Sequence, residues 1–305
     1  MNSKNRKLLL RYGENPNQKA HLISSSNKTI YDFQISGKKI SYNNILDLDS
    51  GIKCLNEFRE PTSIIMKHTN PCGVASANNI NKAFKKSLES DKKSAFGGII
   101  FLNRKVNSSL ANNIGEKFFE MLVAPKFEDR AVKILSSKKN LILLKMPDCE
   151  NKLADYRSTL FGDLYQTNDL LPINKKFIDL VAYKEISSKS KQDLIFSLKV
   201  VKHLKSNAVV ISKNKQTLGL GHGQTNRVDA LKLAIKNKKN YFKKTAFVCA
   251  SDGFFPFTDS IKILKKNGCS VIAQPPGSIN DEEIISFAKK NKISLYFIKN
   301  RLFKH

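Results

Sequence analysis

Two side chains that can exchange protons stand next to each other in the segment 63–74, SIIMKHTNPCGV. Lys67 carries an ammonium group, and the imidazole of His68 gains and loses a proton near neutral pH. The apolar run 64–66 precedes them, and an asparagine–proline pair and a glycine follow, which predicts a buried strand that ends in a turn. Ligands bind at the carboxyl ends of strands in open α/β sheets. We therefore expect Lys67 and His68 to face a ligand and to carry out acid–base chemistry.

Cys72 raises the question of a metal, because a proline precedes it as in the PCxxC half of the zinc deaminase signature. Ala75 stands where the second cysteine of that signature would be, and no HxE sequence precedes the segment. The five cysteines of the chain are widely spread and form no CxxC pair. This spacing argues against a structural zinc site and against a disulfide framework, so we predict no metal site.

Polar or aromatic clusters follow several other predicted strands. Arg11 and Tyr12 could clamp a phosphate and stack on a ring. The segment GLGHGQTNR (219–227) could place glycine backbone and Arg227 around an anion at a helix N-terminus, although a tight turn explains the glycines better. The segment SDGFFPFTD (251–259) combines aromatic rings with two carboxylates, which suits a flat ligand with polar edges. Two more clusters follow the last strands: PPGS (275–278) and RLFKH (301–305). Each cluster alone has a structural explanation, and together they predict one cleft.

The elements that carry these residues are short apolar runs that alternate with amphipathic segments, which predicts an α/β fold with a largely parallel sheet. The predicted strands are 63–66, 99–102, 121–123, 141–144, 208–212, 217–220, 246–250, 271–273 and 295–298. Ser190 and Asp193 have the spacing of a capping box at the start of a helix. The weakly patterned segment 151–189 would connect two lobes, 1–150 and 190–305, with similar strand–helix alternation.

Length and composition allow one large domain or two ordinary domains, since the chain has 305 residues and 41% of them are apolar. No run approaches the ~18 consecutive apolar residues of a membrane span, and the N-terminus has no signal-peptide pattern. We therefore expect a cytoplasmic protein without a membrane partner. The net charge of +27 would suit a polyanion. The lysines are scattered as doublets without a nucleic-acid motif, so we favour solvated helix faces and expect no nucleic acid partner.

Several motifs occur in one order along the chain: LRYGENPNQ (10–18), KHTNPCGVA (67–75), SAFGG (94–98), KSNAVV (205–210), GHGQTNRVDA (221–230), SDGFFPFTDS (251–260), PPGSIND (275–281) and RLFKH (301–305). With them the chain resembles, over essentially its whole length, the formyltransferase domain of the AICAR transformylase/IMP cyclohydrolase family. The resemblance implies two tandem three-layer α/β/α units of the cytidine-deaminase type, without zinc. It also implies a homodimer with active sites across the interface. The family's cyclohydrolase domain has no counterpart here, so we expect no cyclohydrolase activity from this chain.

The resemblance implies formyl transfer from 10-formyltetrahydrofolate to the 5-amino group of the imidazole carboxamide ribonucleotide AICAR, which gives FAICAR in purine (IMP) biosynthesis. His68 would be the general base, Lys67 would stabilise the oxyanion or help the folate nitrogen leave, and Asn207 would position the formyl group. The residues implied to hold the nucleotide are Arg11, Tyr12, Gly97, Glu120, Arg227, Phe254, Ser278 and Arg301, with Arg227 suited to its phosphate. Asp259 and the neighbouring phenylalanines would meet the folate, and His305 matches the family's last residue.

The sequence departs from the family pattern at three places near the implied pocket. His222 stands where a small residue is expected, Thr225-Asn226 replaces the commoner Met-Ser, and Glu120 replaces the aspartate of some members. These departures concern details of the pocket, and the reaction class is unchanged. The resemblance further implies a monovalent cation such as potassium near Asp252.

The chemistry of the Lys67–His68 pair is consistent with such a reaction. An aromatic amine conjugated with a carboxamide is a poor nucleophile, so a base has to remove its proton during attack. A neutral imidazole is the base required, and an adjacent ammonium favours the neutral form. Two alternatives stay open on the residues alone: a nucleotide-binding module without catalysis, and a basic protein that binds nucleic acid.

Overall fold

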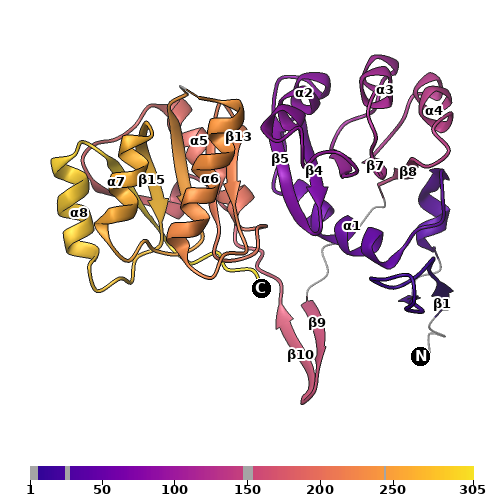
Figure 1. Cartoon of the computed structure of the whole chain (residues 1–305), viewed down its shortest axis with the longest axis horizontal. Coiled ribbons are helices and arrows are strands. Elements are labelled where there is room, and N and C mark those ends of the chain that lie inside the picture. Colours follow the sequence, from indigo (N-terminus) through magenta and orange to yellow (C-terminus); the bar gives the residue numbers. More distant parts are fainter. Residues whose placement is uncertain (1–5, 25–27, 147–153, 244) are drawn as a thin grey trace.

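A mixed sheet runs through the molecule and joins two halves, which lie side by side in Figure 1. The computed structural model describes residues 6–24, 28–146, 154–243 and 245–305. Within them the sheet has 12 strands in the order β11-β16-β15-β14-β12-β13-β5-β4-β6-β7-β8-β3. Helices pack on both faces of this sheet, so the predicted α/β fold is confirmed.

The same order of elements occurs twice along the chain: a helix, a hairpin, a second helix, and three strands separated by two helices. The first run is α1 (Tyr42–Leu55), β4 (Thr62–Lys67), β5 (Asn70–Ser76), α2 (Ile80–Ser90), β6 (Ile99–Leu102), α3 (Ser108–Gly115), β7 (Met121–Ala124), α4 (Asp129–Ser136) and β8 (Ile142–Lys145). The second run is α5 (Ser188–Val201), β12 (Val209–Lys213), β13 (Gln216–Gly221), α6 (Arg227–Tyr241), β14 (Phe247–Ser251), α7 (Thr258–Lys266), β15 (Cys269–Gln274), α8 (Asp281–Lys290) and β16 (Ser294–Ile298).

The other described elements lie at the ends of the sheet or outside it. They are the edge strands β3 (Gln34–Ser36) and β11 (Ile178–Ala182), the hairpin of β1 (Arg6–Leu9) with β2 (His21–Ser24), the hairpin of β9 (Ala154–Thr159) with β10 (Gly162–Thr167), and two 3₁₀ helices at Ile30–Phe33 and Lys175–Phe177. The segment expected to connect two lobes thus contains a hairpin and an edge strand. Its expected start, at residue 151, lies outside the described residues.

The sheet is mixed, and the prediction of a largely parallel sheet is wrong. Among the described strands of this sheet, parallel pairing is confined to β6–β8 and β14–β16. Two tight turns, His68–Thr69 and Asn214–Lys215, produce the antiparallel pairs β4–β5 and β12–β13. All four turn residues have positive φ between 51° and 63°. Turns with two positive φ values fold a strand straight back on itself. The residues after His68 therefore form β5, where the sequence predicted only a turn.

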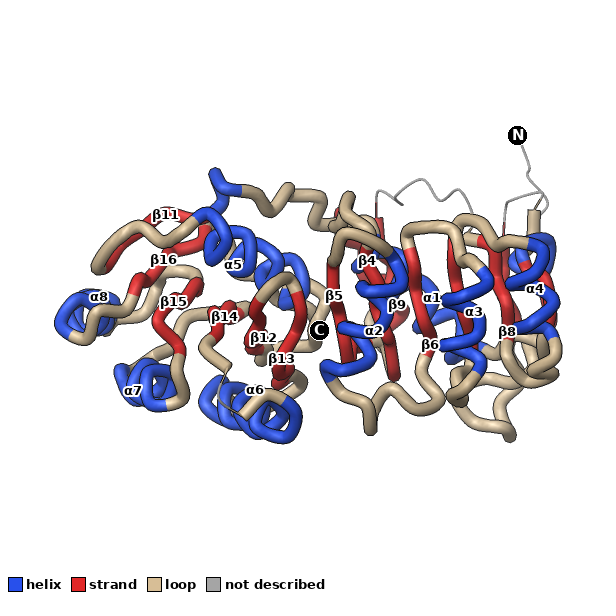
Figure 2. Tube along the Cα trace, turned by 90° about the horizontal axis from the view of Figure 1, so that it is seen from above, coloured by secondary structure: helices blue, strands red, loops and turns tan. Residues whose placement is uncertain are grey.

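The two halves meet where β5 pairs antiparallel with β13, with Ala75 opposite Gln216. The hydroxyl oxygen of Thr217 accepts a hydrogen bond from the backbone N–H of Val74 at 3.0 Å. A second join lies in the core, because α1 and α5 pack over one hydrophobic cluster with residues from both halves. On the opposite face, α2–α4 and α6–α8 cover separate clusters (Figure 2). In the described ranges, every helix is too short or too polar to cross a membrane.

The N-cap of helix α5 lies three residues before Ser190, so the predicted capping box of Ser190 and Asp193 is wrong. Ser187 is its N-cap, and the Ser187 hydroxyl accepts from the backbone N–H of Ser190. The buried Asp193 instead holds the β12–β13 turn, accepting from the backbone N–H groups of Asn214 and Lys215 at 2.9 and 2.8 Å. The carboxylate thus satisfies backbone donors that the turn leaves without a ladder partner.

The glycines of GLGHGQTNR serve packing, which decides against the anion-cradle interpretation. Gly219 and Gly221 lie within β13, and α6 presses against them. A Cβ at Gly221 would stand 1.8 Å from the carbonyl oxygen of Ala230, and one at Gly219 would stand 2.0 Å from that of Ala234. Both obstacles are helix backbone, so only glycine lets α6 approach this closely.

We expect Gly221→Ala to destabilise the protein by about 1–3 kcal/mol, the usual cost of overpacking a close contact. Gly115→Ala is the matched control, because a Cβ at Gly115 meets nothing within 4 Å. Urea unfolding followed by circular dichroism measures both. Equal stability of the wild type and Gly221→Ala would show that α6 can shift away freely.

Candidate active site

The sheet topology brings the predicted site residues to one long edge of the sheet. Lys67 ends β4, and because β4 runs antiparallel to β6, Gly97 and Glu120 lie just before the amino ends of β6 and β7 at the same edge. In the second half, the same edge holds the start of β12 and the carboxyl ends of β13–β16. The expectation of carboxyl strand ends therefore holds for the second half, whereas β6–β8 present their amino ends. Asn70 joins the halves here, since its Oδ1 accepts from the backbone N–H of Lys205 at 3.0 Å.

The turn that carries the imidazole is held by residues outside the motif. His68 and Thr69 have φ values of 51° and 63°, a region that non-glycine residues adopt rarely. Asp47 on α1 accepts from the backbone N–H of Thr69 at 2.5 Å, and Asn70 Nδ2 donates to the His68 carbonyl at 2.9 Å. Burial raises the pKa of Asp47, and the Thr69 bond and the charge of His68 offset part of that rise. Asp47 thus positions His68, a role that its sequence place near a helix start did not indicate.

Lys67 and the predicted nucleotide residues of the first half form one group, which we call the first cluster: Arg11, Tyr12, Lys67, His68, Gly97 and Glu120. Lys67 Nζ donates to the carbonyl of Phe96 at 2.8 Å, directly beside Gly97, whose φ is 71°. The Arg11 guanidinium lies 4.6 Å from the Tyr12 ring centre and 3.8 Å from Glu120 Oε1. Lys38 Nζ also approaches Glu120 Oε1, at 2.8 Å. These contacts order the cationic and aromatic groups before any ligand binds.

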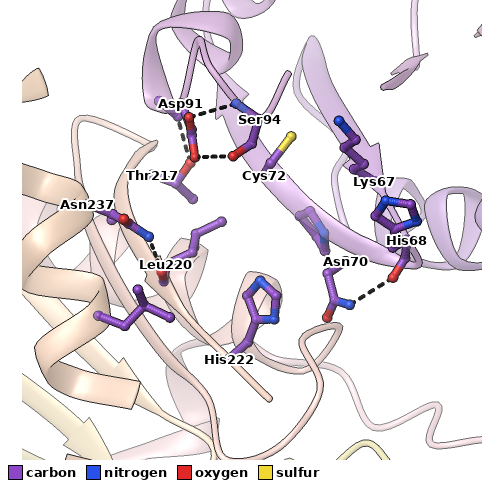
Figure 3. Close-up of a pocket in the computed structure, with 14 residues that line it drawn as sticks. Lys67, His68, Asn70, Cys72, Asp91, Ser94, Thr217, Leu220, His222 and Asn237 are labelled. Carbon is purple, nitrogen blue, oxygen red and sulfur yellow. Dashed lines mark hydrogen bonds between the residues drawn. The ribbon is translucent and has the colours of Figure 1, made fainter. Parts of the chain in front are cut away.

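A cavity of about 250 Å³ opens between the two halves beside the first cluster (Figure 3). Lys67, His68 and Asn70 line it from the first half, and Thr217 and His222 from the second. Burial lowers the pKa of His222, so this imidazole is neutral near pH 7. The unexpected His222 therefore narrows the cavity without adding charge to it.

Cys72 also lines this cavity, and its surroundings argue against a role as thiolate. The Cys72 thiol donates to the Ile65 carbonyl at 3.3 Å. Burial raises the pKa of Cys72 to about 12. A thiolate is the form that binds metals and attacks substrates, and this environment disfavours it.

The predicted residues of the second half form a second cluster, which comprises Asn207, Arg227, Phe254, Asp259, Ser278, Arg301 and His305. Its centre is the fully buried carboxylate of Asp252. Arg227 Nη2 donates to Asp252 Oδ1 at 2.8 Å, and Ser206 Oγ donates to Asp252 Oδ2 at 2.5 Å. The ring of Phe303 lies 5.8 Å from the Arg227 guanidinium and 4.9 Å from that of Arg301. Because Asp252 already balances Arg227, the exposed Arg301 is the better placed of the two to bind an anion.

The polar members of the second cluster make bonds within the protein. Asn207 Nδ2 donates to the Gln224 carbonyl at 2.8 Å, which leaves its side-chain oxygen to accept from a ligand. Ser278 Oγ donates to the Pro256 carbonyl at 3.4 Å. Asp259 accepts from the following backbone N–H in the first turn of α7.

The outer members of the two clusters, Glu120 and Arg301, are too far apart in one chain to contact one small ligand. Eight strand positions separate β7, beside Glu120, from β16, before Arg301. Neighbouring strands lie about 4.8 Å apart, so these positions are roughly 40 Å apart along the edge. Of the second cluster, no residue lines the cavity that contains Lys67 and His68. Within the described residues, a single chain therefore keeps the outer members of the two clusters apart, although the halves meet where Asn70 accepts from the backbone N–H of Lys205.

The fold and these clusters define an α/β protein with a candidate acid–base site. Comparison with known proteins shows the family to which it belongs. The model of the AICARFT/IMPCHase bienzyme family matches residues 1–237, and the chain belongs to this family. The chain is 46% identical over 305 residues to the bifunctional purine biosynthesis protein PurH of Caldicellulosiruptor bescii, covering 97% of this chain and 59% of that protein. It is 42% identical to the PurH of Fusobacterium nucleatum, with the same coverage, and 45% identical to that of Buchnera aphidicola. The chain spans about three-fifths of the length of these relatives.

Proposed function

We propose that this chain transfers the formyl group of 10-formyltetrahydrofolate to the 5-amino group of AICAR, producing FAICAR. The observation that carries the proposal is the Lys67–His68 pair at the mouth of the cavity between the halves, in a chain that matches the AICARFT/IMPCHase family. No specific observation favours a non-catalytic nucleotide-binding module or a nucleic-acid-binding protein. The proposed setting is the cytoplasm, with AICAR and reduced folate as partners.

In the proposed reaction the amine nitrogen of AICAR attacks the formyl carbon, and the bond from that carbon to N10 of the folate breaks. His68 takes the proton that the amine loses. Lys67 provides positive charge for the oxyanion or a proton for the departing N10, since its ammonium is fixed on the Phe96 carbonyl beside the turn. Asn207 supports the formyl oxygen or amine through its side-chain amide. General-base assistance of this kind accelerates a reaction by about 100- to 10,000-fold.

The substrate groups match the chemistry of the two clusters. A nucleotide would use the Arg11–Tyr12 pair, Gly97 and Glu120 of one cluster, and Arg301 for its phosphate. The second cluster would complete the site with the residues Arg227, Phe254, Asp259, Ser278 and His305. Because about 40 Å of sheet edge separates the ends of these clusters in one chain, we propose that each site combines the first cluster of one chain with the second cluster of another, in a homodimer.

We also propose that the fold consists of two cytidine-deaminase-like units, 1–150 and 190–305, joined by 151–189. The repeated element order supports it. A monovalent cation such as potassium fits poorly at Asp252, because Arg227 balances the carboxylate charge and both of its oxygens accept from protein donors. No step of the proposed reaction uses such a cation.

A spectrophotometric assay with AICAR and 10-formyltetrahydrofolate tests the proposal, since it follows the tetrahydrofolate produced. We expect formyl transfer by the purified chain, and no closure of FAICAR to the inosinate ring in a parallel cyclohydrolase assay. Nucleotide binding in calorimetry without formyl transfer would support the non-catalytic alternative. Strongly salt-dependent binding of DNA or RNA would support the other alternative.

A further inference from the structure

Lys38 approaches Glu120 more closely than Arg11 does, although Lys38 lies outside the motifs that indicated the site. Its Nζ lies 2.8 Å from Glu120 Oε1, whereas Arg11 Nη2 lies 3.8 Å from the same oxygen. The first distance is that of a charge-assisted hydrogen bond, and the second is too long for any hydrogen bond. The carboxylate is therefore bonded to the lysine and not to the arginine beside it.

Arg11 keeps N–H donors that the described part of the chain does not use. Its Nη2 donates to the Tyr12 hydroxyl at 2.9 Å. Its Nε–H is buried and has no hydrogen-bond partner among the described residues. A guanidinium has several donors, and a buried donor without a partner costs free energy. The site therefore lacks an acceptor beside Arg11, which an oxygen of a bound ligand would supply.

The backbone that carries Lys38 is held in place by its neighbours. Gln34 Nε2 donates to the carbonyl oxygens of Gly37 and Lys38, at 3.1 and 3.0 Å. Gly37 has a φ of 97°, and a Cβ there would stand 2.3 Å from the carbonyl oxygen of Leu141. The backbone N–H of the residue after Leu141 donates to the Glu120 carbonyl at 3.1 Å. Lys38 and Glu120 thus stand on backbone that contacts the same end of β8, which keeps the two side chains together.

The bond between Lys38 and Glu120 prevents a different pair. A guanidinium and a carboxylate form two parallel hydrogen bonds when nothing competes for the carboxylate. Such a pair between Arg11 and Glu120 would use the arginine donors that a ligand needs and would cancel the arginine charge. Because Lys38 occupies Oε1 of the carboxylate, Arg11 stays available for a ligand.

We propose that Lys38 is a positioning residue of the nucleotide site, which bonds Glu120 and thereby keeps the Arg11 guanidinium free to bind an oxygen of the nucleotide. This role rests on the proposed function for the identity of the nucleotide. Lys38 acts through the other two residues and takes no part in the chemical step. Its loss should therefore weaken nucleotide binding and leave the rate at saturation unchanged.

Calorimetric titration with AICAR and steady-state kinetics of formyl transfer test this role in the full chain. We expect Lys38→Met to raise the Kd of AICAR at least about tenfold, the value of one charge-assisted hydrogen bond, with kcat unchanged. Lys38→Arg keeps a cation and a donor at this place, so it should restore most of the affinity. Lys39→Met is the matched control, because Lys39 is the exposed neighbour and its loss removes the same charge. This control should bind AICAR like the wild type.

A double variant decides whether Lys38 acts through Glu120. In Glu120→Gln the carboxylate that could capture Arg11 is gone, so the addition of Lys38→Met should weaken binding little further. A lysine that only attracted the negative charge of the nucleotide would cause the same loss in both backgrounds, and that result would overturn the proposal. Wild-type affinity in Lys38→Met alone would overturn it as well.

Chemical modification of Arg11 tests the same contact without a ligand. Phenylglyoxal reacts with arginine side chains, and mass spectrometry of the digested protein gives the rate at Arg11. The reaction should be several-fold slower in Lys38→Met than in the wild type, because Glu120 then binds the guanidinium, and unchanged in Lys39→Met. Unchanged reactivity in Lys38→Met would contradict the role of Lys38 even in a protein that bound no AICAR. Slower modification in Lys38→Met, together with a wild type that transfers no formyl group, would contradict the proposed function alone.

Discussion

Replacing His68 with alanine should lower kcat for formyl transfer by about 100- to 10,000-fold, the range that a positioned general base contributes. The AICAR amine is conjugated with its ring and carboxamide, so attack on the formyl carbon stalls unless a base takes the proton. The imidazole stands on a turn that Asp47 and Asn70 hold in place. Water in its place would be neither as basic nor as well oriented. Nucleotide affinity should change little, because other residues of the two clusters are the proposed nucleotide ligands.

Steady-state kinetics and calorimetric titration of AICAR measure the two effects separately. His21→Ala is the control, since His21 is an exposed histidine on β2 and takes no part in either cluster. Added imidazole should restore part of the lost rate in His68→Ala, which a purely structural role of the side chain would not explain. Wild-type kcat in His68→Ala would exclude His68 as the base, and loss of nucleotide binding with kcat would assign it a structural role.

The apolar runs and helical spacings in the sequence predicted the positions of most strands and helices, since burial of one face dictates those patterns. The direction of the strands was not predictable in the same way. It depends on two turns, His68–Thr69 and Asn214–Lys215, which have positive φ without containing glycine. The usual signal of such turns is an Asn-Gly or Asp-Gly pair, and neither turn has one. The hairpin of β4 and β5, and with it the antiparallel seam between β5 and β13, was therefore hidden. The hairpin of β12 and β13 was predicted, because the apolar runs 208–212 and 217–220 lie on either side of a turn at Asn214.

The site was predictable at the level of residue types and motifs, but its supporting residues were not. Asp193 was predicted to cap a helix, and Asp47 stood near the predicted start of one. Each of them accepts from backbone N–H groups of a turn more than twenty residues away. Such partners meet only after folding, so local spacing carries no trace of them. The sequence does not show the order of the strands either, so it predicted one cleft. The strand order instead separates the ends of the two clusters by roughly 40 Å of sheet edge.

Mixing two inactive variants should restore activity if each site takes one cluster from each chain. His68→Ala inactivates the first cluster, and Asn207→Ala inactivates the second, so either homodimer should be nearly inactive. In a mixed dimer, one site receives both substitutions and the other receives neither. Two-fold symmetry makes these the only two sites. A purified mixed dimer should therefore show roughly half of the wild-type kcat per dimer.

Co-expression of the two variants with different affinity tags, followed by tandem purification, isolates the mixed dimer for the formyl-transfer assay. Homodimers carrying each tag serve as controls and should stay inactive when measured separately. If one chain formed a complete site by itself, each chain of the mixed dimer would carry a defect in its own site, and no activity would return. Restored activity would then have no source other than the pairing of clusters from two chains. Because Asn70 and Lys205 are bonded within one chain, the result decides whether that short connection or the dimer brings His68 and Asn207 to the same substrate.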